Sequence, residues 1–298
     1  MYKNIIKIIL FSLLILDINK AHAVKLEDIS IIVPSCDKYS GLWEPFFNLL
    51  FKNWPALNQN GEDQDIPIYF ISNNKEFNHP RVQNIKFPNE ISWSDNMLEA
   101  LSQVKTKYIL YLQEDYFLTK PVNVSLLAEM LQYLKQKNAA FLQIAYFASQ
   151  VQTVKQLLSA DNNGRIQEFT KHSPFRVSLQ AGLWERDSFM WLLKSGENIW
   201  RFEVDGSKRS EGMQKLFLAN TSDSDMPIHY LNAVAYGMLL KGAVDYLHNQ
   251  NIAFDPKLQA LPLDQDIKSK LIMFKRRTTH RIVDFIKKHQ DTIKKIIL

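Results

Sequence analysis

Residues 108–118 read YILYLQEDYFL, a strand-like run that leads directly into two adjacent acidic residues. The first part, 108–112, is apolar or aromatic at every position and does not alternate with polar residues. Such a run is typical of a strand buried on both faces, as in a parallel sheet with helices on either side. The acidic pair, Glu114 and Asp115, is therefore expected just beyond the end of a buried strand.

Two similar runs precede it in the chain, ISIIVPS at 29–35 and IPIYFIS at 66–72. Between the runs lie segments with the three- and four-residue apolar spacing of helices, at 42–50 and at 93–104, where Ser92 or Ser94 is a suitable N-cap. This alternation of strands and helices predicts an α/β fold with a mixed, mostly parallel sheet flanked by helices.

Polar residues follow the first two predicted strands, and sheets of this class bind ligands at the carboxyl ends of their strands. Ser35 and Asp37 follow the first strand, and Asn73 follows the second. We expect these three side chains to contact the base or ribose of a nucleotide. Neither GxGxxG nor GxxxxGK[ST] occurs anywhere in the sequence, which argues against a Rossmann dehydrogenase and a P-loop NTPase.

Without a glycine-rich loop, a diphosphate must be neutralised in another way, and the acidic pair suggests a metal. Mg²⁺ or Mn²⁺ typically binds through one or two carboxylates together with phosphate oxygens. Asp115, assisted by Glu114, is therefore the predicted metal ligand. The alternative is that the pair simply opens a turn.

The same segments carry a family resemblance. They are the polar loop after the first strand, a second strand followed by Asn73, the helix from Trp93 to Leu101, and YILYLQEDYFL. This order resembles the nucleotide-sugar half of GT-A-fold glycosyltransferases, with Glu114–Asp115 in place of their DxD motif. SLQAGLWERDSFMWLL at 178–193 and SGENIWRFEVDGSKRS at 195–210 resemble the acceptor half of bacterial enzymes of that fold.

The resemblance covers roughly residues 28–245 and implies a GT-A-like domain over 24–255. It implies transfer of a sugar from a nucleotide-sugar donor to a glycan or glycolipid acceptor, with inversion and with a divalent metal. Inverting transfer needs a carboxylate that takes the proton from the acceptor hydroxyl. By resemblance Glu203 is this base, Asp205 is held in reserve, and His229 is a further metal ligand or else a hydrogen-bonded structural residue.

Glycine and aromatic residues around these acids are expected to shape the substrate pocket. Trp93, Gly182 and Trp184 are assigned to it, Gly182 because a side chain there would block close approach. Trp200 and Phe202 either floor a sugar site or belong to the core. Glu203 and Asp205 would share a side in an extended segment and diverge in a helix.

The chain has a net charge of +5 and a pI of about 9.0, and the excess positive charge lies at its two ends. Residues 1–23 carry +2 and have the basic start, apolar run and small-x-small ending of a secretory signal, cleaved or retained as an anchor. Residues 271–298 hold eight basic against two acidic residues, or +6, within a predicted basic amphipathic extension at 256–298. The remaining −3 body argues against a nucleic-acid partner.

These ends predict an exported or membrane-associated protein, which would face the cytoplasm if the signal is an uncleaved anchor. The C-terminal extension is expected either to contact an anionic membrane or to dock on its own domain. Two other functions fit the same sequence. One is a nucleotidyltransferase on a similar sheet, and the other is a non-catalytic, membrane-attached binding protein.

Overall fold

The computed structural model describes residues 25–89, 91–145, 157–159, 164–222, 224–235 and 237–255. The predicted signal at 1–23 and the predicted extension at 256–298 lie outside these ranges. The described residues belong to two compact units. The first includes the chain up to Asp37, Phe51–Gln113 and Lys120–His229, and the second includes Lys38–Leu50, Glu114–Thr119 and the chain from Tyr230 onward. A single domain over 24–255 stays a prediction.

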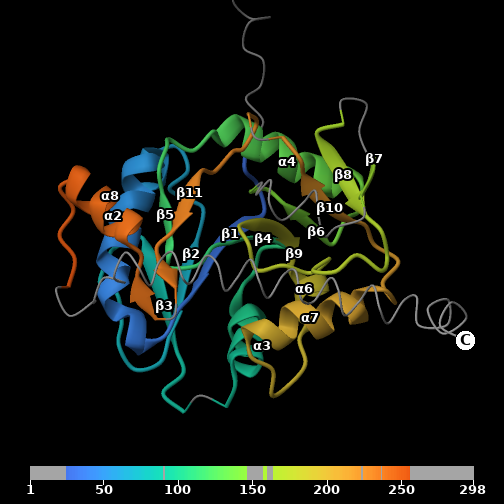
Figure 1. Cartoon of the computed structure of the whole chain (residues 1–298), viewed down its shortest axis with the longest axis horizontal. Helices are drawn as coiled ribbons and strands as arrows, with labels where there is room; N and C mark the ends of the chain where they lie inside the picture. The colour runs from blue at the N-terminus through green and yellow to red at the C-terminus, as the bar shows by residue number, and fades with distance from the viewer. Residues whose placement is uncertain are drawn as a thin grey trace, which may run out of the picture. The chain divides into compact units, whose positions relative to one another are not determined.

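The first unit is built on one nine-stranded sheet (Figure 1). In spatial order its strands are β3 (Val82–Lys86), β2 (Ile68–Ser72), β1 (Ile29–Pro34), β4 (Tyr108–Tyr111), β9 (Gly182–Glu185), β6 (Phe141–Gln143), β10 (Phe217–Asn220), β8 (Ile166–Phe169) and β7 (Leu157–Ser159). Of these strands, β8 and β9 run opposite to the others. The predicted mixed, mostly parallel sheet is confirmed.

The three apolar runs form neighbouring parallel strands in this sheet. Every residue of β1 and of β4 is buried, which explains why their sequences do not alternate. β3 escapes prediction from sequence because it is an edge strand, in which the buried residues Val82 and Ile85 are interspersed with more exposed ones.

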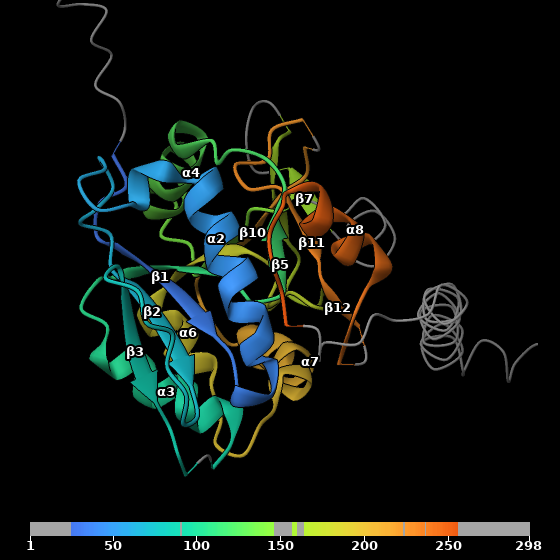
Figure 2. The same cartoon turned by 90° about the vertical axis from the view of Figure 1, so that its left-hand side faces the viewer.

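Helices cover both faces of the sheet in the first unit. Figures 1 and 2 show α4 (Val124–Gln136) on one face and α3 (Trp93–Gln103), α6 (Arg186–Leu192) and α7 (Ile199–Ser210) together on the other. One core cluster joins α3, α6 and α7 to the sheet through residues such as Leu101, Phe189 and Phe202. The predicted cap of α3 is confirmed at Ser92, whose side chain accepts a hydrogen bond from the Asp95 N–H at 3.1 Å.

The second unit contains most of α2 (Trp43–Asn53), a two-stranded sheet of β5 (Tyr116–Leu118) and β11 (Tyr230–Asn232), the pair β12 (Val234–Ala235) and β13 (Met238–Leu239), and α8 (Lys241–Asn249). Stacked Tyr116 and Tyr230 rings, with centroids 4.2 Å apart, hold β5 to β11. Figure 2 shows α8 beside these strands, where the Tyr246 hydroxyl donates to the Leu118 carbonyl at 2.9 Å.

Among the described residues, none of the helices has the length and the apolar character needed to cross a membrane.

Candidate functional site

The loops after β1 and β2 lie side by side at the carboxyl end of the sheet because these strands are parallel neighbours. The Asp37 N–H donates to the Asn73 side-chain oxygen at 3.1 Å. The Asp37 carboxylate in turn accepts from the N–H groups of Asn74 and Lys75, each at 3.1 Å. The structure thus brings Asp37 and Asn73 together, and Ser35 lies in the same loop.

Asp37 carries a fixed negative charge at this edge. Burial acts to raise the pKa of Asp37, but the hydrogen bonds from Lys75 and Asn74 outweigh it and hold the pKa below its ordinary value. An ionised carboxylate repels phosphate groups and accepts hydrogen bonds from hydroxyl or base N–H groups. The loop chemistry is therefore suited to the nucleoside part of a ligand.

The acidic pair follows β4 and begins a segment of the second unit, where Asp115 is held by its backbone. The Asp115 carbonyl accepts from the Ala233 N–H at 2.7 Å, next to the pairing of β5 with β11. Asp115 as a whole is half-buried, yet its Oδ1 is shielded from solvent and has no hydrogen-bond partner among the described residues. Burial raises the pKa of Asp115 to about 7.

An enclosed carboxylate oxygen without a hydrogen-bond partner is a suitable ligand for a hard divalent cation. The neighbouring Glu114 is also buried, at 9% exposure. Within the described residues no three His, Cys, Asp or Glu side chains converge on one point, so a cation here would take its other ligands from phosphate oxygens and water. His229 lies in the first unit, and burial together with nearby Lys120 lowers its pKa, which favours the neutral imidazole.

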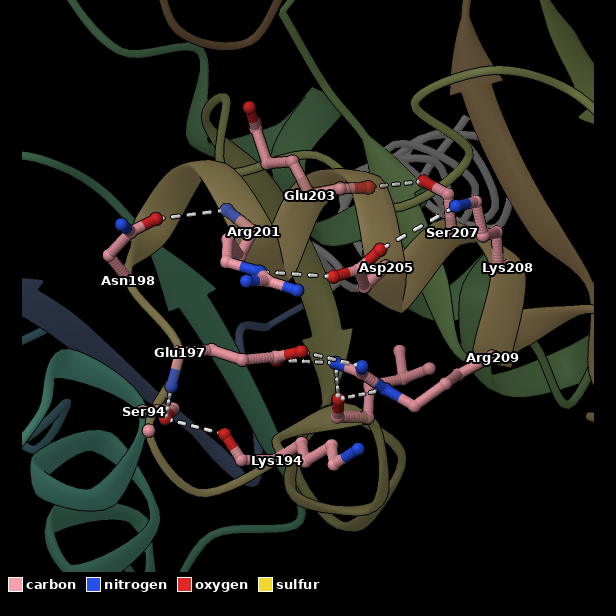
Figure 3. Close-up of polar contacts among 12 residues, drawn as sticks. Ser94, Lys194, Glu197, Asn198, Arg201, Glu203, Asp205, Ser207, Lys208 and Arg209 are labelled. Carbon is pink, nitrogen blue, oxygen red and sulfur yellow. Dashed lines mark hydrogen bonds and ion pairs between the residues drawn. The ribbon is translucent and has the colours of Figure 1, made fainter.

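Glu203 and Asp205 lie on a helix, α7, so their side chains diverge as expected for that case. Asp205 forms ion pairs with Arg201 at 3.3 Å and with Lys208 at 3.6 Å on the outer surface. Figure 3 shows Glu203 leaving α7 on a different side from this group. Asp205 is therefore part of a surface ion-pair group, and the role of Glu203 as base stays a prediction.

The Glu203 side chain is fixed by a contact with the chain that leads into β9. Its Oε1 accepts from the Leu179 N–H at 2.7 Å, and the Leu179 carbonyl accepts from the Gln113 side chain at 3.4 Å. One turn further along α7, the Ser207 hydroxyl accepts from the Val177 N–H at 3.0 Å. Gln113 was not among the predicted site residues, although it directly precedes the acidic pair.

A buried ion pair anchors the start of α7. Glu197, 6% exposed, binds the Arg209 guanidinium through both oxygens, at 2.7 and 2.6 Å. The Glu197 N–H donates to the Ser94 hydroxyl at 3.0 Å, which itself donates to the Lys194 carbonyl at 2.6 Å (Figure 3). Nothing local in the sequence signals this pair, because its partners are twelve residues apart and Ser94 lies on another helix.

Two residues assigned to the pocket are packing residues, which corrects the sequence analysis. Trp184 is fully buried, with its ring stacked on Phe141 at a centroid distance of 4.1 Å. A Cβ on Gly182 would meet the Phe141 ring at 2.5 Å, so the close approach that needs glycine is that of a core side chain. Trp93 is half-buried against Phe202, with ring centroids 5.2 Å apart, at the edge of the same core.

No protein-family model and no curated protein matches the chain. Among solved structures, the chain is similar to residues 1–349 of TarS from S. aureus, with 13% identity and a TM-score of 0.42 over 66% of this chain and 61% of that one. A mannosyltransferase from Pyrobaculum calidifontis, in complex with GDP-Man and Mn2+, has 10% identity and a TM-score of 0.43 over 65% and 54%.

A UDP-glucose pyrophosphorylase complexed with UDP-glucose is also similar, with 6% identity and a TM-score of 0.42 over 64% of this chain and 89% of that one. The chain thus spans about three fifths of TarS 1–349 and just over half of the mannosyltransferase.

Proposed function

We propose that the protein is a glycosyltransferase that moves a sugar from a nucleotide-sugar donor to a glycan or glycolipid acceptor. The observation that carries this proposal is the enclosed Oδ1 of Asp115, which lies between β4 and β5 and has no hydrogen-bond partner in the part of the chain that the structure describes. A buried carboxylate oxygen of this kind is suited to bind a cation. A cation with few protein ligands takes phosphate oxygens as further ligands.

Each group of residues has its own task in this proposal. Asp37 and Asn73 bind the nucleoside, Asp115 with Glu114 binds the diphosphate end through Mg²⁺ or Mn²⁺, and Glu203 takes the acceptor proton. A bound metal would supply positive charge that offsets the charge on the leaving nucleoside diphosphate. His229 is left out of this proposal, because no three His, Cys, Asp or Glu side chains converge on one point among the described residues.

The reaction is proposed to invert the anomeric carbon. Glu203 accepts the proton of the acceptor hydroxyl while that oxygen forms the new bond to the anomeric carbon. The bond from this carbon to the diphosphate oxygen breaks on the opposite face, and the electron pair leaves with the nucleoside diphosphate. The Leu179 N–H, bound to Oε1 at 2.7 Å, keeps the Glu203 carboxylate oriented for this step.

The test is hydrolysis of a panel of nucleotide-sugars by the purified full-length protein, with Mn²⁺, with Mg²⁺ and with chelator. We expect free sugar from at least one donor, loss of that activity in Asp115→Ala, and its retention in Asp245→Ala, which alters an exposed ion pair on α8. Formation of a nucleotide-sugar from a nucleoside triphosphate and a sugar phosphate would indicate a nucleotidyltransferase. Absence of binding to every nucleotide-sugar by calorimetry would contradict the enzyme proposal.

A further inference from the structure

Trp200 stands apart from the buried tryptophans of the chain. Trp43, Trp54 and Trp184 are at most 3% exposed, whereas Trp200, in the first turn of α7, is 70% exposed. Phe202, two positions further on, is fully buried. The two aromatic residues that the sequence left open thus have different roles, because Phe202 belongs to the core and Trp200 faces outward.

The helix places Trp200 beside the candidate base. Residues three and four apart are neighbours on a helix surface, so Trp200 lies next to Glu203 and to Val204, which is itself 45% exposed. The exposed Arg201 follows it directly. The exposed Trp200 ring thus shares one helix surface with the Glu203 carboxylate and with Val204.

The backbone that carries the ring is held in place. The Asn198 side chain caps α7 by accepting from the Arg201 N–H at 3.0 Å, and the preceding Glu197 is bound to Arg209 and Ser94 (Figure 3). A platform fixed in this way loses little conformational entropy when a ligand packs on it.

We propose that Trp200 is the platform on which the acceptor is bound, and that this acceptor is a pyranoside. A pyranose ring has an apolar C–H face that packs on an aromatic ring and hydroxyl groups that bind planar polar side chains. This inference rests on the proposed function, because Glu203 must be the base for Trp200 to hold the reacting sugar.

The charge of this surface favours a sugar over an anionic membrane. An interfacial helix on anionic lipid has unpaired basic residues around its apolar face. On α7 both Arg201 and Lys208 are paired with Asp205, which offsets much of their charge. Together with the Glu203 carboxylate, the formal charges of Arg201, Lys208 and Asp205 sum to zero, as suits an uncharged glycan.

The test uses the full chain with every tryptophan replaced by 5-fluorotryptophan, whose resonances are assigned by single Trp→Phe variants. Methyl glycosides of glucose, galactose, mannose and N-acetylglucosamine are titrated without any nucleotide. We expect the Trp200 resonance to shift with at least one glycoside, while that of Trp191, 56% exposed on α6, stays in place and serves as the internal control.

A second arm measures the acceptor dependence of transfer. Trp200→Ala should raise the KM for the acceptor about tenfold, and Trp200→Phe should restore most of this loss. A Trp200 resonance that no glycoside moves, in a protein that still hydrolyses a donor, overturns this inference and leaves the proposed function intact. A response to anionic phosphatidylglycerol vesicles without a response to glycosides also overturns it, in favour of membrane docking.

Discussion

Asp115 makes the stability of the protein depend on pH in a direction opposite to that of an ordinary carboxylate. Burial raises its pKa from 3.8 to about 7, so between these pH values the folded state holds a proton that the unfolded state has lost. The stabilisation from the protonated Asp115 carboxyl is fully present below pH 3.8, the pKa of this group in the unfolded state. It is lost as the pH rises toward 7.

We therefore expect Asp115→Asn, which cannot ionise, to gain stability relative to the wild type as the pH rises. From pH 5 to pH 8 in chelator, the gain should be on the order of 2 kcal/mol, below the full linkage value because the residue is partly exposed. Urea unfolding at several pH values measures this difference. Parallel stability curves for the two proteins would show that the Asp115 carboxylate is already ionised at low pH.

Glu203 is the residue on which the proposed chemical step depends. Glu203→Gln keeps the size of the side chain and an oxygen that can accept from the Leu179 N–H, but it cannot take up the acceptor proton. Transfer to acceptor should fall by about 10² to 10⁴-fold, with donor binding unchanged by calorimetry. The comparison is Glu211→Gln, at an exposed pair with His172, which should transfer at the wild-type rate. Equal rates in both variants would remove Glu203 from the reaction.

Side-chain positions could be predicted from sequence where strand order alone decides them. Asp37 and Asn73 were placed together correctly because both follow parallel strands that are neighbours. Trp184 was placed wrongly, since its strand β9 is buried throughout and the sequence does not show that its ring packs on Phe141. Trp200 and Phe202 could be separated only once α7 was known to be a helix.

At the scale of elements, α7 depends on the pair between Glu197 and Arg209. Arg209→Ala leaves the Glu197 carboxylate buried without its partner, and the Leu192 carbonyl also loses the donor Nε at 2.9 Å. We expect a loss of about 3 kcal/mol in the free energy of unfolding.

The matched control for this loss is on the same helix. Arg201→Ala removes the exposed pair with Asp205 and should change the stability by no more than about 0.5 kcal/mol. Urea unfolding of the two variants at neutral pH gives the comparison. Similar losses in both would mean that the Glu197–Arg209 pair contributes no more than a surface pair.

At the scale of the whole molecule, the nine-stranded sheet depends on close packing at its central strand β9. Gly182 pairs with Tyr111 on one side and with Gln143 on the other, and a Cβ there would meet the buried Phe141 ring. Gly182→Ala should destabilise the protein by about 1–3 kcal/mol.

Gly242→Ala, in the first turn of α8 with open space around it, should leave the stability unchanged or slightly raised. Thermal unfolding of both variants tests the contrast. If Gly182→Ala is as stable as the wild type, Phe141 has room to move and the strand is less tightly packed than described.

The class of the fold could be predicted because the apolar runs of β1, β2 and β4 are long and uninterrupted. The insertion of β9 between β4 and β6 could not be predicted. β4 and β9 are some seventy residues apart, and pairing over such a distance leaves no periodic signal in the sequence. The two compact units escaped prediction for the same reason, since each is assembled from distant segments.

The place of β9 in the sheet also sets an order of events while the chain is being made. β1 to β4 can pair as soon as residue 111 has left the ribosome, but the free edge of β4 has no partner until residues 182–185 emerge. For all of that interval a fully buried strand of the finished protein presents an open, apolar edge. Because β9 pairs with both β4 and β6, its late synthesis leaves the edges of both strands uncovered until it emerges, and a nascent chain that stalls before it exposes them to other chains.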